Sequence, residues 1–188
     1  MGVSEITRAR GEFFLRISHD AEFCEIIDHV GGILVGVLQN RGTILICGNG
    51  GSSSQSQHMA GEIVGRFLKE RPGLPAIALS ADTATITAVA NDYGYEKVFS
   101  RQVEAYGGSN SALVGLSTSG NSANVIQAMA KAKELGVRTV GLLGKNGGRL
   151  QEMCDHVILV PSDDTQEIQE MHLHVIHLLC GIIDEQVG

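Results

Sequence analysis

The stretch that decides the fold spans residues 43–66 and reads TILICGNGGSSSQSQHMAGEIVGR. Its first five residues form an apolar, β-branched run of the kind expected for a strand buried on both faces. A loop rich in glycine and serine follows, and then a segment compatible with a helix. Main-chain NH groups, hydroxyls, an imidazole and a carboxylate are thus concentrated in one short stretch. It is the best single place in the chain to look for chemistry.

The same order of strand, loop and helix recurs along the chain. The predicted strands are residues 43–47, 76–79, 112–116, 138–143 and 156–160. The helix-compatible stretches between them are residues 54–68, 82–90 with 96–105, 122–135 and 148–153. This alternation predicts an α/β fold, with a parallel sheet, helices on both faces and right-handed crossovers.

The predicted sheet places several loops on one rim. In such sheets, ligands bind beyond the carboxyl ends of the strands, where the strand order reverses. The loops expected on this rim are residues 48–54, 80–82, 117–122 and 144–147.

Two helical segments frame the alternating region. Apolar residues recur at helical intervals between residues 6 and 39, which predicts two helices or one long bent helix. This segment packs either on another subunit or on its own sheet, and the pattern leaves both open. Residues 166–185 follow the turn-like Pro-Ser-Asp-Asp of residues 161–164 and predict a long amphipathic helix. No linker or repeat is visible, so we expect a single domain over residues 1–188.

Composition narrows the class of protein. A net charge of −7 without a cluster of Lys and Arg argues against a nucleic-acid surface, although one local phosphate pocket remains compatible with it. No run reaches the roughly 18 apolar residues that span a bilayer, and the first residues lack the features of a signal peptide. We therefore expect a cytoplasmic protein with neither nucleic acid nor membrane as partner. The four cysteines show no CxxC spacing and are expected to be reduced thiols, mostly buried.

Two predicted strand ends open into polar loops, GNGGSSS at residues 48–54 and STSGNS at residues 117–122. Glycines let the main chain approach a ligand, and a helix N-terminus offers free NH groups, so such loops suit phosphate. The alternative is that the Ser and Asn side chains merely cap the helices. Neither loop is a nucleotide motif: the first lacks a Walker A ending, and Ser53 stands where a dinucleotide motif has its third glycine. A small phosphorylated metabolite is the expected ligand.

Titratable side chains follow at helical spacing. His58 and Glu62 are four residues apart, so they share one helix face, where they suit a general base or a divalent metal, or simply a solvated surface. The last helix carries His172, His174 and His177, which cannot all face one site because two residues turn a helix by about 200°.

Two further sets of polar residues could belong to the same site. Gln169 and His177 could serve one pocket only from its opposite ends or across subunits, and His177 could also be a half-buried interface histidine. Asn91 and Asp92, at a predicted helix end, could bind sugar hydroxyls or mark a turn.

Six motifs in this order and spacing resemble the sugar isomerase (SIS) domain family and, within it, the bacterial phosphoheptose isomerases. They are GNGGSSSQSQHMAGEIVGRF, RPGLPAIALS, ANDYGYEKVFSRQVEA, LSTSGNSANVIQAMAKAKELG, LLGKNGGRL and IQEMHLHVIHLL. The resemblance implies a flavodoxin-like, three-layer fold with a five-stranded parallel sheet. It also implies a homotetramer with sites at subunit interfaces, in which residues 1–40 take part in oligomer packing. The implied reaction converts sedoheptulose 7-phosphate to D-glycero-D-manno-heptose 7-phosphate, which opens ADP-heptose biosynthesis for lipopolysaccharide core or other surface glycans.

The resemblance also assigns expected roles to residues. Those expected to meet the phosphate or nearby hydroxyls are Ser52, Ser117, Thr118, Ser119 and Ser122. Those expected to line the rest of the substrate are Asn49, Gly50, Gly51, Asn91, Asp92 and Gln169. Glu62 resembles the base that moves a proton between C1 and C2 through an enediol, and His177 resembles its partner for the O1 and O2 protons. No role is assigned to Asp163, Asp164 or Gln166.

A divalent metal, usually zinc, is held in some members of the family. The matching residues are His58, Glu62, Gln169 and His177, which implies one Zn²⁺ per subunit. A Glu62 bound to metal is not at the same time a free base, so a catalytic, structural or inhibitory role for the metal stays open.

An alternative function comes from other SIS proteins, which are non-enzymatic regulators that bind the bacterial replication initiator or a sugar phosphate. The initiator-binding proteins share the GNG, RPxLPAIAL and IQEMH segments. They lack the acid and the histidine that this chain has at Glu62 and His177, which favours the isomerase.

Overall fold

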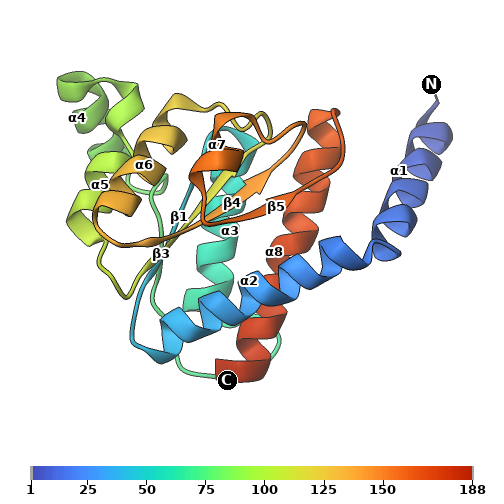
Figure 1. Cartoon of the computed structure of the whole chain (residues 1–188), viewed down its shortest axis with the longest axis horizontal. Helices are drawn as coiled ribbons and strands as arrows, with labels where there is room; N and C mark the ends of the chain where they lie inside the picture. Colours follow the sequence, from blue (N-terminus) through green and yellow to red (C-terminus); the bar gives the residue numbers. More distant parts are fainter. Residues whose placement is uncertain (1, 188) are drawn as a thin grey trace.

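The computed structural model describes residues 2–187 and contains one five-stranded parallel sheet (Figure 1). The strand order is β2-β1-β3-β4-β5. The strands are β1 (Ile44–Gly48), β2 (Ala76–Ala78), β3 (Ala112–Ser117), β4 (Arg138–Leu143) and β5 (His156–Leu159). This is the flavodoxin-like order, so the predicted fold class is confirmed.

The strand order reverses between β1 and β3. After β1 the chain moves to one side to form β2, and it returns to the other side of β1 to form β3. The pairing of β1 with β3 is in register, with Ile44 beside Ala112 and Gly48 beside Leu116. The loops that follow these two strands therefore leave the sheet side by side, as expected for the ligand-binding rim.

Helices cover both faces of the sheet, so the chain has three layers (Figure 1). Those that pack in one apolar layer are α1 (Val3–Ser18), α2 (Ala21–Gln39), α3 (Gly51–Val64) and α8 (Thr165–Val187). Those on the other face are α4 (Thr83–Tyr93), α5 (Ser100–Tyr106), α6 (Ala123–Glu134) and α7 (Gly148–Met153), with the short 3₁₀ helix η1 (Tyr95–Lys97). Successive residues of β1 alternate between the two cores, since Ile44 and Ile46 face one and Leu45 and Cys47 the other.

The N-terminal segment forms two helices, one of the two alternatives that the pattern allowed. The break lies at His19 and Asp20, where the Asp20 carboxylate accepts a hydrogen bond from the Phe23 main-chain NH and so caps α2. Arg10 ties α1 to the start of α8 through ion pairs with Glu167 (2.6 Å) and Glu170 (2.7 Å). The segment thus packs partly on its own subunit, while α1 keeps an exposed face.

Helix α3 differs from its predicted span of residues 54–68, because it begins at Gly51 and ends at Val64. It begins early because Gly50 adopts a positive φ of 56°, which turns the chain into the helix directly after the strand. None of the helices within residues 2–187 is both long and apolar enough to cross a membrane.

The two adjacent glycines of α2 have opposite environments. A Cβ on Gly31 would lie 2.7 Å from Ile182 Cδ1 and 3.3 Å from Ile182 Cβ, whereas a Cβ on Gly32 would meet nothing within 4 Å. Gly31 is therefore where α2 packs directly on α8.

We expect Gly32→Ala to raise the free energy of unfolding by roughly 0.5–1 kcal/mol, since alanine loses less main-chain entropy in a helix. Gly31→Ala should lower it by about 1–3 kcal/mol, because the added methyl group forces Ile182 away. Urea denaturation at one fixed protein concentration measures both. Equal effects of the two substitutions would contradict the close packing of α2 on α8.

Candidate active site

The two polar loops lie next to each other at the carboxyl edge of the sheet. The loop at residues 48–54 follows β1 and leads into α3, and the loop at residues 117–122 follows β3 and leads into α6. In the second loop, Ser117 Oγ and Ser122 Oγ are 2.9 Å apart. Thr118 and Ser119 are half-buried beside them, and Ser119 Oγ accepts a hydrogen bond from the Asn121 NH.

The residues that precede α3 and α6 do not cap these helices with a side chain. Ser122 precedes α6 and Gly50 precedes α3, and neither position supplies a side-chain hydrogen bond to the helix. A side-chain cap is therefore absent at the N-cap positions of both helices. Ser52 is only 3% exposed, and its main-chain NH donates to the Asn49 carbonyl oxygen at 3.0 Å within the loop.

Asn49 links the first loop to the opposite layer of helices. Its amide forms a reciprocal pair with that of Asn124, with both N–O distances at 2.8 Å. The Tyr95 hydroxyl also donates to Asn49 Oδ1 at 3.1 Å. Sequence reasoning missed Asn124 and Tyr95 as site residues. Asn124 lies in the SGNSAN segment and could have been considered, whereas nothing in the sequence marks Tyr95.

Helices α3 and α8 run past each other and carry the other predicted residues. At one end, a Cβ on Gly51 would lie 2.6 Å from Gln169 Nε2, so the glycine makes room for the Gln169 amide. Gln55 Nε2 then donates to the Gln169 main-chain oxygen at 2.6 Å. One to two turns further on, His58 faces His177, with their Nε2 atoms 3.0 Å apart.

His58, Glu62 and His177 form a cluster that we call the α3–α8 polar cluster. Glu62 Oε1 lies 3.5 Å from His58 Nε2, and the Phe67 ring stacks on that of His177 at 5.6 Å and 16°. The side chains of His58 and Glu62 are 40% and 26% exposed, so both are open to solvent or a ligand. His177 of α8 thus approaches His58 of α3 within one chain, whereas Gln169 of α8 lies beside Gly51 and Gln55.

Gln169 and His177 lie at opposite ends of the α3–α8 contact. They are eight residues apart on α8, which corresponds to a rise of about 12 Å. Gln169 sits beside the glycine loop, and His177 sits beside His58. Within one chain, the two residues therefore lie at separate places along the α3–α8 contact.

The three histidines of α8 have separate environments, as predicted. His172 is fully buried, and its Nε2 lies 3.1 Å from the Leu143 carbonyl oxygen at the end of β4. Burial lowers the pKa of His172 to about 4 despite this hydrogen bond, so the ring is neutral. His174 packs edge-on against Phe14 of α1, and burial and the neighbouring His177 lower its pKa.

Asn91 and Asp92 lie exposed at the end of α4, where Asn91 Nδ2 donates to Asp92 Oδ1 at 2.8 Å. Within residues 2–187, no hydrogen bond joins either side chain to the other predicted site residues. They lie shortly before Tyr95, whose hydroxyl donates to Asn49.

The donor types around His58 suit zinc. Two imidazole nitrogens on a tetrahedral Zn²⁺ are about 3.3 Å apart, given Zn–N bonds of about 2.0–2.1 Å, and the His58–His177 distance of 3.0 Å is close to this. Yet no three His, Cys, Asp or Glu side chains of residues 2–187 converge as a group that could hold a metal ion. Of the four expected ligands, His58 lies close to His177 and to Glu62, and Gln169 lies beside the start of α3.

The fold and the loops at its switch point define the class of protein. The sequence pattern of the SIS domain family matches residues 18–144 of this chain. A phosphoheptose isomerase of Helicobacter pylori (strain Shi470) is 57% identical over 152 residues, which cover 81% of this chain and 79% of that protein. The chain therefore belongs to the phosphoheptose isomerase family of SIS-domain proteins.

Solved structures agree with this assignment. A phosphoheptose isomerase from Francisella tularensis superposes with a TM-score of 0.92 at 37% identity, over 97% of this chain and 96% of that chain. The phosphoheptose isomerase GmhA from Neisseria gonorrhoeae gives a TM-score of 0.88 at 40% identity, over 98% and 100%.

The conformation of the second loop requires glycine at position 120. Gly120 adopts a φ of +66°, and a Cβ there would lie 1.8 Å from the Gly147 carbonyl oxygen. We expect Gly120→Ala to lower the free energy of unfolding by roughly 1–3 kcal/mol and to weaken binding of a phosphate-bearing ligand, because the loop must move off α7. Gly108→Ala is the control, since nothing lies within 4 Å of a Cβ there. Denaturation and calorimetric titration measure both effects, and equal stability of the two variants would contradict the prediction.

The buried His172 makes stability depend on pH. Its pKa is about 4 when folded and 6.5 in the reference state, so the unfolded chain binds more protons between these values. Stability from this residue is complete above pH 6.5 and is lost as the pH falls toward 4, by a total on the order of 3 kcal/mol. Denaturation at several pH values measures the free energy of unfolding, which should depend less steeply on pH between 4 and 6.5 for His172→Gln than for wild type. Parallel slopes would contradict the assignment.

Proposed function

We propose that the protein is an aldose–ketose isomerase that converts sedoheptulose 7-phosphate to D-glycero-D-manno-heptose 7-phosphate. The observation that carries this proposal is the α3–α8 polar cluster, which unites Glu62 and His177 from distant parts of the chain. The relatives named phosphoheptose isomerase match this chain at 50–57% identity over more than three quarters of their length. The non-enzymatic alternatives are not favoured, because these relatives carry the name of an isomerase.

The switch-point loops would hold the substrate. The hydroxyls of Ser117, Thr118, Ser119 and Ser122, with the loop at Ser52, are proposed to bind the phosphate, supported by the position of both loops at the starts of α3 and α6, where the helix dipole favours an anion. Asn49, Gly50, Gly51, Asn91, Asp92 and Gln169 are proposed to contact the sugar. Because the Asn49 amide already exchanges hydrogen bonds with Asn124 and accepts one from Tyr95, its contact with the sugar would use the remaining Nδ2 hydrogen.

The α3–α8 polar cluster would supply the proton transfers. The Glu62 carboxylate takes a proton from C1 of the ketose, the electron pair forms the C1–C2 double bond of an enediol, and O2 gains a proton. Glu62 then returns the proton to C2 as O1 loses its own, so C1 becomes the aldehyde carbon. The protonated His177 ring gives O2 its proton in the first step and takes the O1 proton in the second, so the ring ends in its initial state; the Phe67 ring stacks on it. Positioned acids and bases of this kind contribute roughly 10²- to 10⁴-fold in rate.

We include Zn²⁺ in the proposal. Its expected ligands are His58, Glu62 and His177, at one end of the α3–α8 contact, and Gln169. When bound there, the metal would act as a Lewis acid that polarises the substrate carbonyl. The exposed imidazole and carboxylate side chains fit such an ion by chemical type.

Assembly into a homotetramer with sites at subunit interfaces is proposed from the exposed apolar surface. A groove beside α8 is lined by Phe67, Leu68, His174, His177, Leu178 and Ile182. Leu68 is 74% and Leu178 40% exposed, and α1 exposes Val3, Ile6 and Leu15. A partner subunit covering these faces would enclose His177. We place the enzyme in the cytoplasm, as a single SIS domain supplying ADP-heptose biosynthesis for lipopolysaccharide core or other surface glycans.

We expect Glu62→Gln to reduce kcat for sedoheptulose 7-phosphate by about 10²- to 10⁴-fold, because the amide cannot accept the C1 proton. The measurement is NMR in deuterated water, which follows both heptose formation and deuterium incorporation at C1 and C2. The same measurement is repeated on wild type and Glu62→Gln after treatment with a chelator. If Glu62 acts only as a metal ligand, the substitution lowers kcat only in the metal-loaded protein; if Glu62 is the base, it lowers kcat in both.

Glu70→Gln is the control, because Glu70 is exposed and pairs only with Arg66 among the described residues. Absence of turnover by the wild type would refute the isomerase. Turnover that survives Glu62→Gln would refute the proposed base and leave the substrate assignment intact.

A further inference from the structure

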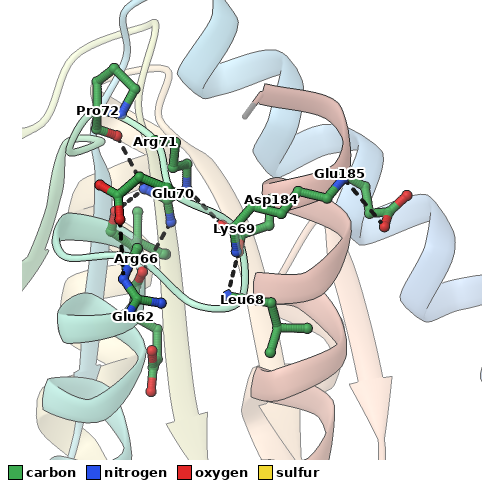
Figure 2. A network of polar contacts seen from close by, with 10 residues as sticks. Glu62, Arg66, Leu68, Lys69, Glu70, Arg71, Pro72, Asp184 and Glu185 are labelled. Carbon is green, nitrogen blue, oxygen red and sulfur yellow. Dashed lines mark hydrogen bonds and ion pairs between the residues drawn. The ribbon is translucent and has the colours of Figure 1, made fainter.

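A buried ion pair joins the end of α3 to α8 next to the α3–α8 polar cluster. Arg71 Nε donates to Asp184 Oδ1 at 2.6 Å, and the two side chains are 1% and 2% exposed. Figure 2 shows Arg71 between the last turn of α3, which carries Glu62, and the α8 helix, which carries Asp184. Neither residue is among those expected to bind substrate or metal.

The guanidinium group also completes the end of α3. Arg71 Nη2 donates to the Glu62 carbonyl oxygen at 3.0 Å, and Nη1 donates to that of Ile63 at 2.9 Å. The last four carbonyl groups of a helix have no partner within the helix, and a positive charge is favourable there. Arg71 therefore holds the main chain of the residue proposed as the catalytic base.

The carboxylate of Asp184 holds the loop that follows α3. Its Oδ2 atom accepts hydrogen bonds from the Leu68 NH at 2.6 Å and the Lys69 NH at 2.9 Å (Figure 2). The preceding residue is Phe67, whose ring stacks on His177. His177 and Asp184 are seven residues apart on α8, two turns along nearly the same face. Asp184 thus fixes the ring that covers the second catalytic candidate.

Stability alone does not account for such a pair. Removing two charges from water is costly, and well-packed apolar residues of similar volume are often as stabilising as a buried ion pair. Burial would raise the pKa of Asp184, but hydrogen bonds from the Lys69 NH, Arg71 and the Leu68 NH lower it below its usual range. Every nitrogen of the guanidinium and both oxygens of the carboxylate have hydrogen-bond partners. These bonds reach the Glu62 carbonyl oxygen on one side and, on the other, the NH groups of the two residues that follow Phe67.

We infer that Arg71 and Asp184 are positioning residues for the isomerase reaction: Arg71 sets Glu62 through its carbonyl oxygen, and Asp184 sets His177 through Phe67. The inference rests on the proposed function for its kinetic consequence. Helix ends fray, and a displacement of about 1 Å at a reacting group can cost roughly 10²-fold in rate. The phosphate loops lie at the other end of α3 and do not touch this pair.

The test compares Arg71→Lys and Asp184→Asn with wild type. Lysine keeps the charge but lacks the planar fork that reaches several acceptors, and asparagine keeps the shape but lacks the second accepting oxygen. We expect kcat to fall by about 10- to 100-fold and KM for sedoheptulose 7-phosphate to change less than about threefold. In NMR spectra of histidine-labelled protein, the His177 ring signals should lose the shielding caused by the stacked Phe67 ring.

Asp155→Asn is the matched control. Asp155 accepts hydrogen bonds from the Thr139 NH (2.9 Å) and Thr139 Oγ1 (2.8 Å) at the amino end of β4, away from the polar cluster. This variant should lose stability without a change in kcat or in the His177 signals. A fall in kcat equal to that of Asp184→Asn would attribute both effects to general destabilisation and overturn the inference.

Two further measurements cover the cases in which the variants do not fold or the wild type does not isomerise the substrate. Should Arg71→Lys and Asp184→Asn fail to fold, Phe67→Leu removes the ring above His177 with the ion pair intact, and an unchanged kcat would overturn the inference. If the wild type does not isomerise the substrate, the proposed function fails. The His177 NMR signals then test whether Arg71 and Asp184 position the His177 ring. Signals unchanged in all of the folded variants would refute the positioning role.

Discussion

The in-register pairing of β1 with β3 is the constraint on which the rest of the structure depends. It places the ends of two strands that are far apart in sequence next to each other, with Gly48 beside Leu116. Both strands are buried on both faces, so a shift of one residue would move every side chain into the opposite core, where it would have to pack against different neighbours. The hydrophobic core thus fixes the separation of the two polar loops, although no residue of those loops contributes much to the core.

A second constraint is the packing of α8 alongside α3. Helix α3 starts at the rim and leads away from it, and α8 packs alongside it, so polar side chains face each other at intervals along the contact. Gly51 and Gln169 meet near the rim, and His58 and His177 meet further along. The sheet therefore determines the place of the loops, while helix packing determines the place of the titratable groups.

The sequence predicted the strands and most helices because their signals are local. A β-branched run that is buried on both faces, such as residues 44–48, reads as a strand wherever it occurs. The predicted end of α3 lies several residues too late, because the true end depends on a residue outside the helix. The Arg71 guanidinium donates hydrogen bonds to the carbonyl oxygens of Glu62 and Ile63. Tyr95 was missed for the same reason, since its role exists only once η1 has been folded against the loop of Asn49.

The spacing of residues on a helix proved more informative than the types of residue alone. Four-residue spacing predicts that His58 and Glu62 lie together, and helical geometry predicts that Gln169 and His177 lie apart; both predictions are confirmed. Residue type gave no such guidance for Arg71 and Asp184, which would be read from sequence as ordinary surface charges. Their burial follows from carbonyl and NH groups that the end of α3 and the next loop leave without partners, and these groups must be satisfied wherever water is excluded. The end of α3 therefore has a charged partner for its last carbonyl groups, and this partner contacts the main chain of Glu62, the residue proposed as the catalytic base.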